Sequence, residues 1–166
     1  MPEVIVINGP PGVGKPSVTA QLRTLVPGTV AISGAQLRAF APPDARAHLG
    51  GGATYRVAGA LASAFMQLGA KRVLFEYEFL RASHLAYFRD ALTVSAELHV
   101  FTLWAPLECL VERSGGQPDA RPSGLTLVDS HREMATNLSQ LGQIVETDRL
   151  SAAEVARHIH ERLPHS

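Results

Sequence analysis

The chain has 166 residues, 46% of them hydrophobic, which is enough for one domain with a substantial core. Its 15 basic and 15 acidic residues cancel and form no blocks, which disfavours a nucleic acid or an anionic membrane as partner. The single cysteine, Cys109, excludes an intrachain disulfide, and no apolar run approaches the roughly 18 to 20 residues of a membrane span. We therefore expect one cytoplasmic domain over residues 1–166.

Short apolar runs alternate along the chain with segments of helical period, which predicts an α/β fold with a mostly parallel sheet. The runs are rich in Val, Ile, Leu and Phe, as strands buried on both faces of a sheet require. We predict strands near residues 3–8, 29–33, 72–77, 97–104 and 143–146.

Four of the intervening helices are predicted from apolar residues spaced by three or four. The first carries Val18, Leu22 and Leu25 before Pro27, and the second carries Val57, Leu61, Phe65 and Leu68 before Gly69. The third carries Leu127, Met134, Leu138 and Leu141 before Gly142, and the last carries Val155, Ile159 and Leu163. This last helix opens at the capping box Ser151-Ala-Ala-Glu154. Two segments, 41–52 and 114–124, are expected to be loops near a site.

The segment between the first predicted strand and the first predicted helix carries the strongest motif. Residues 9–15 read Gly-Pro-Pro-Gly-Val-Gly-Lys, and Gly9, Gly14 and Lys15 fill fixed positions of the Walker A pattern G-x-x-x-x-G-K-[ST]. In such a phosphate loop, backbone N–H groups surround the phosphates and the lysine reaches the β- and γ-phosphates. The residues predicted to bind nucleotide here are Gly9, Pro10, Pro11, Gly12, Val13, Gly14, Lys15, Pro16 and Ser17.

Pro16 departs from this motif, because it stands where a Ser or Thr hydroxyl should hold Mg²⁺. Proline suits the first turn of a helix, but here it removes an N–H donor and the hydroxyl and disfavours helical dihedral angles at Lys15. Ser17 follows one residue late, and one residue along a helix turns a side chain by about 100°. We expect weakened rather than abolished Mg-nucleotide binding, with Ser17 and Glu76 as candidate metal ligands.

The order of these segments resembles the small P-loop kinases, a nucleoside-monophosphate-kinase-like group that includes chloramphenicol phosphotransferase, shikimate and gluconate kinases and polynucleotide kinase domains. The resemblance covers nearly the whole chain. It rests on the phosphate loop and on the segments Ile32–Arg38, Gly69–Leu80, Leu103–Arg113 and Glu146–Ser151. It implies a three-layer α/β/α fold with a five-stranded parallel sheet in the order 2-3-1-4-5. The nucleotide would bind at the carboxyl ends of the strands, under an arginine-containing lid at about residues 114–124.

Glu76 ends the third predicted strand, where the resembled kinases usually place an aspartate that contacts Mg²⁺-bound water or the attacking hydroxyl. It is our preferred catalytic carboxylate, and a solvated glutamate at a strand end is the alternative. Glu78 would share its face if the strand continued, and is the weaker candidate. Ala35 stands where these kinases often carry an aspartate base, and alanine cannot take a proton.

Several polar residues are assigned from their places in the resembled fold. Arg113 and Arg121 bracket the lid and could neutralise charge on the transferred phosphoryl group, although solvated roles are as compatible with the sequence. Asp148 would lie near the nucleotide base. The residues assigned to acceptor binding are Arg38, Tyr55 and Arg56.

Two functions remain in competition at this stage. The first is an ATP-dependent kinase that transfers the γ-phosphoryl group to a hydroxyl of a small molecule, with ATP and Mg²⁺ as cofactors. The second is a nucleotide-binding protein with a degraded active site that acts as a sensor or regulator, which Pro16 and Ala35 favour. The neutral charge disfavours phosphorylation of nucleic-acid ends. The acceptor, the choice between ATP and GTP, and the oligomeric state, a homodimer included, stay open.

Overall fold

The structure is a computed structural model that describes residues 1–115 and 126–165. Its strands are β1 (Glu3–Asn8), β2 (Val30–Ser33), β3 (Arg72–Glu76), β4 (Glu97–Trp104) and β5 (Gln143–Glu146). Its helices are α1 (Lys15–Leu25), α2 (Gly34–Ala39), α3 (Pro43–Arg46), α4 (Ala53–Gln67), α5 (Ala82–Ala91), α6 (Leu107–Arg113), α7 (Leu127–Asn137) and α8 (Ala152–Arg162), with a 3₁₀ turn at Leu138–Gln140. The strands form one parallel sheet in the order β2-β3-β1-β4-β5, as predicted.

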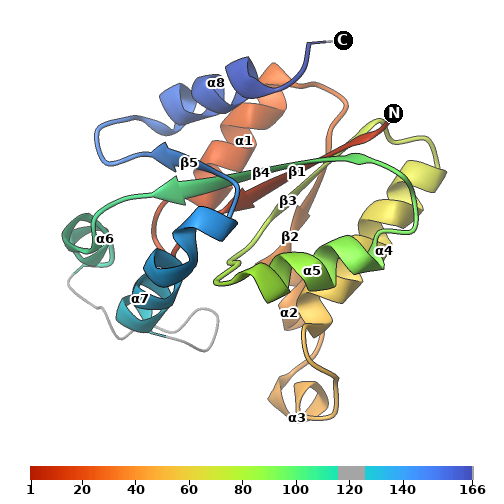
Figure 1. The fold of residues 1–166 in the computed structure, drawn as a ribbon, viewed down its shortest axis with the longest axis horizontal. Coiled ribbons are helices and arrows are strands. Elements are labelled where there is room, and N and C mark those ends of the chain that lie inside the picture. The colour runs from red at the N-terminus through yellow and green to blue at the C-terminus, as the bar shows by residue number, and fades with distance from the viewer. Residues whose placement is uncertain (116–125, 166) are drawn as a thin grey trace.

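Alternate residues of the central strand face two hydrophobic clusters, one on each side of the sheet. Ile5 and Ile7 pack in a cluster with residues of α1 and α8. Val4 and Val6 pack in a second cluster with residues of α4 and α5. Figure 1 shows this arrangement, with α1 and α8 on one side of the strands and α4 and α5 on the other. Burial on both faces explains why the strands are continuous apolar runs rather than alternating ones.

The carboxyl ends of all five strands lie at one edge, because every pairing in the sheet is parallel. In Figure 1 the arrowheads of β4 and β5 point to the side on which α6 and α7 lie. The phosphate loop follows β1 at this edge, and Glu76 is the last residue of β3. The topology therefore brings the phosphate loop and Glu76 together, since β1 and β3 are hydrogen-bonded neighbours.

The predicted inward face of α4 is confirmed in part. Leu61 and Phe65 are partly buried and pack against the second cluster, whereas Val57 is 51% exposed and Leu68, which follows the last residue of the helix, is 85% exposed. The reason is close packing against α5, because a Cβ at Gly59 would lie 2.6 Å from the carbonyl oxygen of Phe88. The buried residues of α4 are Ala58, Gly59, Ala62, Ser63 and Met66. Small residues occupy the contact, and the larger side chains are displaced to its flanks or to solvent.

Two smaller expectations also differ from the structure. Leu25, predicted to face the core, is 36% exposed because α1 ends at this residue. The segment 41–52, predicted as a loop, contains the short helix α3, whose Arg46 N–H donates to the carbonyl oxygen of Pro42 at 2.9 Å. Pro43 occupies its first turn, where the missing N–H has no intrahelical partner to lose.

No helix within residues 1–115 and 126–165 combines the length and apolarity needed to cross a bilayer.

Asn8, the last residue of β1, is fully buried and joins three segments of the chain. Its Oδ1 accepts a hydrogen bond from the Phe79 N–H at 2.6 Å, and its Nδ2 donates to the Phe79 carbonyl and to Thr102 Oγ1, both at 3.0 Å. Thr102 Oγ1 donates in turn to the Leu141 carbonyl at 2.5 Å. The segment after β3 is thereby fixed against the residue that precedes the phosphate loop.

Replacing Asn8 with alanine should destabilise the protein strongly. The change leaves the buried N–H and carbonyl of Phe79 without these partners, and each unsatisfied buried group costs about 1–3 kcal/mol. We expect the free energy of unfolding in urea to fall by about 2–4 kcal/mol. Asn137→Ala is the matched control, because the Asn137 amide makes one hydrogen bond, to Glu133 on the same helix. A loss in Asn8→Ala no larger than in this control would contradict the role of Asn8.

Candidate active site at the carboxyl edge of the sheet

The phosphate loop has a shape that its glycines make accessible. A Cβ at Gly9 would lie 2.7 Å from Cγ1 of Val13 and 2.8 Å from the carbonyl oxygen of Leu103, so no larger residue fits there. Gly14 caps the start of α1 at φ 100°, a conformation that favours glycine. The first N–H groups of a helix have no intrahelical partners, so those of Gly14, Lys15 and Ser17 suit an anion at this point. Pro16 has no N–H and therefore interrupts this series of backbone donors, as predicted from the sequence.

Lys15 lies folded against its own loop. Its Nζ donates to the carbonyl oxygens of Gly9 at 2.7 Å and Pro10 at 3.1 Å, and lies 3.9 Å from Oε1 of Glu78. Burial lowers the pKa of Lys15, and the charges of Glu78 and Glu76 oppose this shift. The ammonium group is therefore held beside two carboxylates, and a phosphate could replace the two carbonyl oxygens as its partner.

Glu76 and Glu78 are both buried at the end of β3. Burial raises the pKa of Glu76, and Glu78 adds to the rise, while Lys15 and a hydrogen bond from Ser33 oppose it. Sequence reasoning preferred Glu76, yet Glu78 is the carboxylate in ion-pair range of Lys15 and the larger influence on its charge. Both residues therefore belong to the candidate site, and a carboxyl with a raised pKa, such as that of Glu76, marks a site of function more often than ordinary surface.

The segment from Tyr77 to Leu80 has no regular structure, but its backbone is held at each residue. The Tyr77 N–H donates to Ile7 O at 3.2 Å, and Asn8 holds both peptide groups of Phe79. The Tyr55 hydroxyl donates to Glu78 O at 2.5 Å, and the Leu80 N–H donates to His84 Nδ1 at 3.0 Å. Burial lowers the pKa of His84, so the ring stays neutral and Nδ1 can accept. Glu78 is consequently presented from a rigid backbone.

One cleft, here named the loop cleft, adjoins the phosphate loop and has a volume of about 230 Å³. Gly12, Val13, Gly14 and Ser17 line one side, and Arg113, Thr147 and Leu150 line the other. The Arg113 guanidinium lies 3.4 Å from the Val13 carbonyl oxygen, which brings a predicted lid residue to the phosphate loop. Asp148, predicted to lie near a nucleotide base, is exposed and does not line the cleft, whereas its neighbour Thr147 does.

A second cleft, here named the apolar cleft, has a volume of about 440 Å³. Of the residues predicted to bind an acceptor, Arg38 and Tyr55 line it. Arg56 does not, since its guanidinium lies over the ring of Tyr87, 5.0 Å from the ring centre. Tyr77, which lies between Glu76 and Glu78 in sequence, also lines the cleft. Arg121, the other predicted lid arginine, lies outside the described residues and stays a prediction.

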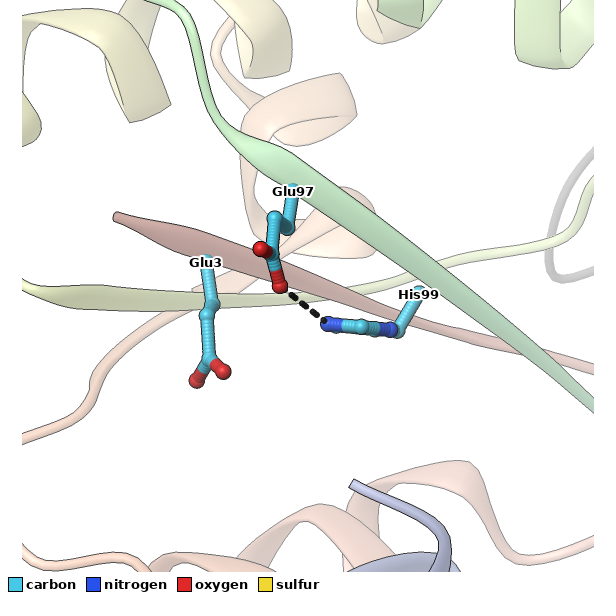
Figure 2. A group of neighbouring side chains, drawn as sticks. All are labelled: Glu3, Glu97 and His99. Atoms are coloured by element: carbon cyan, nitrogen blue, oxygen red, sulfur yellow. Dashed lines mark ion pairs between the residues drawn. The ribbon is translucent and has the colours of Figure 1, made fainter. Parts of the chain in front are cut away.

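One further group of side chains has the spacing of metal ligands, but it lies at the opposite edge of the sheet. Figure 2 shows Glu3, Glu97 and His99 at the amino-terminal parts of β1 and β4, with ligand atoms within 4.8 Å of one another. The Glu3 carboxylate accepts from Arg72 at 2.7 and 2.8 Å, so a cation bound there would compete with a guanidinium. We interpret Glu3 as the partner of Arg72 in an ion pair that joins β1 and β3, while Glu97 and His99 contact each other within β4.

Known structures support the fold of this site, although the sequence itself finds no counterpart among protein-family models or curated proteins. A tunicamycin resistance protein of Deinococcus radiodurans is 21% identical with a TM-score of 0.70, covering 98% of this chain and 95% of its own. A sugar kinase of Janibacter sp. HTCC2649 is 14% identical with a TM-score of 0.71, covering 97% and 94%. A shikimate kinase of Acinetobacter baumannii is 18% identical with a TM-score of 0.59, covering 97% and 92%. The chain thus has the fold of small-molecule P-loop kinases, as the resemblance implied.

The site contains residues that sequence reasoning passed over. Asn8 and His84 hold the backbone that follows Glu78, Tyr77 lines the apolar cleft, and Thr147 lines the loop cleft. A signal existed for Asn8, because a lone polar residue at the end of the apolar run Val4–Ile7 requires a buried partner. No such signal marks Tyr77 or His84, whose roles arise from contacts with segments distant in the sequence.

Glu76→Gln should stabilise the fold at alkaline pH. Because the folded-state pKa of Glu76 is raised, stability present at acid pH is lost as the pH rises through that pKa. A neutral glutamine avoids this loss, so we expect its Tm at pH 8 to exceed that of the parent by about 2–4 °C, the effect of roughly 1 kcal/mol in a domain of this size. The difference should disappear by about pH 4, where the parent carboxyl is also protonated.

The control for this measurement is Glu112→Gln, which changes an exposed glutamate on α6 and should leave Tm unchanged at both pH values. A Tm for Glu76→Gln at or below the parent value at pH 8 would mean that attraction to Lys15 outweighs the cost of burial.

Proposed function

We propose that this protein is an ATP-dependent phosphotransferase that moves the γ-phosphoryl group to a hydroxyl of a small molecule. The observation that carries the proposal is the position of Lys15, in a phosphate loop that lines the loop cleft and beside the buried carboxylates Glu78 and Glu76. The fold shared with sugar and shikimate kinases supports the same reaction class. The proposed reaction needs ATP, which is available in the cytoplasm. A chain with one cysteine needs no oxidising compartment for an intrachain disulfide, so we place the protein in the cytoplasm.

The phosphate loop and Lys15 would hold the nucleotide. The N–H groups of Gly14, Lys15 and Ser17 donate to phosphate oxygens at the start of α1, and Lys15 Nζ exchanges the Gly9 and Pro10 carbonyls for the β- and γ-phosphates. Arg113 adds positive charge from the far side of the loop cleft. The remaining space by Thr147 and Leu150 accepts the nucleoside.

The residues present fit a magnesium ion in part. The Glu76 carboxylate is a hard oxygen donor at the sheet edge, and the charge of Lys15 favours its ionised form. Ser17 is exposed and lines the loop cleft, whereas Glu76 does not line it. We therefore assign the ion to Glu76 and the nucleotide phosphates, and we do not assign Ser17 as a ligand. A bound Mg²⁺ would neutralise phosphate charge during transfer.

We assign Glu78 to the acceptor hydroxyl, because Ala35 stands where the resembled kinases often carry an aspartate base. The backbone of Glu78 is held by Tyr55, a residue of the apolar cleft, and its carboxylate reaches toward Lys15. A carboxylate oxygen of Glu78 would accept the hydroxyl proton as the oxygen attacks the γ-phosphorus and ADP leaves. A loose transition state asks little of this base, so a carboxylate suffices.

The competing function is that of a nucleotide-binding sensor or regulator without transfer. Two observations favour it, namely the missing metal ligand at Pro16 and the exposed Ala35 on α2 in place of a base. Incubation with labelled ATP, Mg²⁺ and a panel of hydroxylated acceptors distinguishes the two functions. Nucleotide binding without transfer to any acceptor would favour the sensor.

Lys15→Ala should abolish phosphoryl transfer while leaving a folded protein. Loss of one preorganised charge on the transferring group costs about 10²–10³ in rate. The matched control is Lys71→Ala, because Lys71 is exposed and is the other of the two lysines in the chain. Transfer rates with labelled ATP and circular dichroism should be measured for both. Transfer by Lys15→Ala at the rate of Lys71→Ala would refute the assignment of the phosphate loop.

Pro16→Ser should tighten the binding of Mg-ATP. The change restores one N–H donor and one hydroxyl ligand at the start of α1, and a hydrogen bond to a charged group contributes about 1.5–3 kcal/mol, or roughly 10- to 100-fold in affinity. Calorimetric titration with ATP in Mg²⁺ and in EDTA measures both contributions, and the gain should be larger in Mg²⁺. Equal affinities of the parent and the variant would show that the proline has no cost.

A further inference from the structure

The apolar cleft differs in chemistry from a site for a polyhydroxylated substrate. Its walls include Leu37, Phe40, Leu49 and Val57. Phe40 is 84% exposed, and Leu49 and Val57 are each 51% exposed. Within the described part of the chain only six large hydrophobic side chains are exposed, and three of them line this one cleft. Such a concentration of exposed apolar surface indicates a binding site for an apolar body rather than ordinary surface.

The charged side chains among the described residues that line the cleft are those of Arg38 and Arg46. Arg38 and Arg46 both lie close enough to oppose the rise that burial causes in the pKa of Tyr77. Thr54 is hydrogen-bonded to the Tyr77 hydroxyl. No aspartate or glutamate is among the described residues that line the cleft. The charge of the cleft lining is therefore positive, and it complements a carboxylate or another hydrogen-bond acceptor.

A sugar or a cyclic polyol would leave most of its hydroxyl groups without partners in this cleft. The Tyr55 hydroxyl already donates to Glu78 O, and apart from the two arginines, Thr54 and Tyr77 the other side chains that line the cleft are apolar. Desolvated hydroxyls without partners lower affinity, whereas an apolar ring against Phe40 and Val57 gains from burial. The volume of about 440 Å³ is sufficient for a body of two fused rings.

We propose that the acceptor is an apolar, ring-containing alcohol that carries an anionic or hydrogen-bond-accepting group. Its ring lies against Phe40, Leu49 and Val57, its anionic group faces Arg38 and Arg46, and its hydroxyl points to Glu78. The inference rests on the proposed phosphotransfer and deepens it by naming the acceptor class. It also separates this chain from the sugar and shikimate kinases that share its fold.

Three probes test this acceptor class by calorimetric titration and by transfer from labelled ATP. They are 6-(hydroxymethyl)-2-naphthoate, 2-naphthalenemethanol, which lacks the carboxylate, and shikimate, which has a carboxylate on a polar ring. We expect the naphthoate to bind at least tenfold more tightly than shikimate, and naphthalenemethanol to fall between them. Shikimate binding as tightly as the naphthoate would overturn the proposal.

Three variants locate the binding. Phe40→Ala and Arg38→Gln should each weaken naphthoate binding by about five- to tenfold, and only Arg38→Gln should reduce its advantage over naphthalenemethanol. Leu68→Ala is the control, because Leu68 is 85% exposed and does not line the cleft. Equal effects of Leu68→Ala and Phe40→Ala would place the probe elsewhere and overturn the proposal.

Titration with ATP in the same samples separates this inference from the proposed function. A parent that binds ATP but none of the aromatic probes refutes the acceptor class and leaves phosphotransfer standing. A parent that binds the naphthoate in the apolar cleft and does not bind ATP supports the cleft chemistry and refutes phosphotransfer.

Discussion

The hydrogen bonds between the Asn8 side chain and the Phe79 peptide groups are the constraint on which the site depends. They join the end of β1, where the phosphate loop begins, to the irregular segment that carries Glu78. Irregular backbone rarely holds a side chain to within the tolerance that catalysis needs. Here Asn8, Tyr55 and His84 supply that rigidity, so a segment without secondary structure positions Glu78 as firmly as a strand would.

Burial works against the charged forms of both Lys15 and Glu76. In the proposed reaction, a divalent cation at Glu76 would stabilise the ionised carboxylate, and a phosphate beside Lys15 would stabilise the ammonium group. Because a divalent cation and a phosphate also attract each other, we expect metal and nucleotide to bind cooperatively in that reaction.

The sequence predicted the strands and the phosphate loop because these depend on local patterns that the fold preserves, whereas the strand order was implied by the resemblance to the P-loop kinases. The apolar runs around Ile5 and Leu74 had to be buried on both faces, and Gly9 and Lys15 are fixed by the motif. The face of α4 was predictable from periodicity only in part, because Gly59 packs so closely on α5 that small residues take the centre of the contact. The positions of Tyr77 and Glu78 depend on Asn8 and Tyr55, which no local pattern connects to them.

The packing of α4 also connects the fold to the chemistry of the apolar cleft. Because Ala58, Gly59 and Ala62 take the buried face, Val57 is turned outward and becomes part of the cleft wall. Two residues earlier on the same helix, Tyr55 lines the cleft and holds the backbone of Glu78. One helix therefore contributes to the wall of the apolar cleft and holds the backbone of the carboxylate that we propose as the base. Under the proposed function, a substitution that rotated α4 to bury Val57 would change recognition and catalysis together.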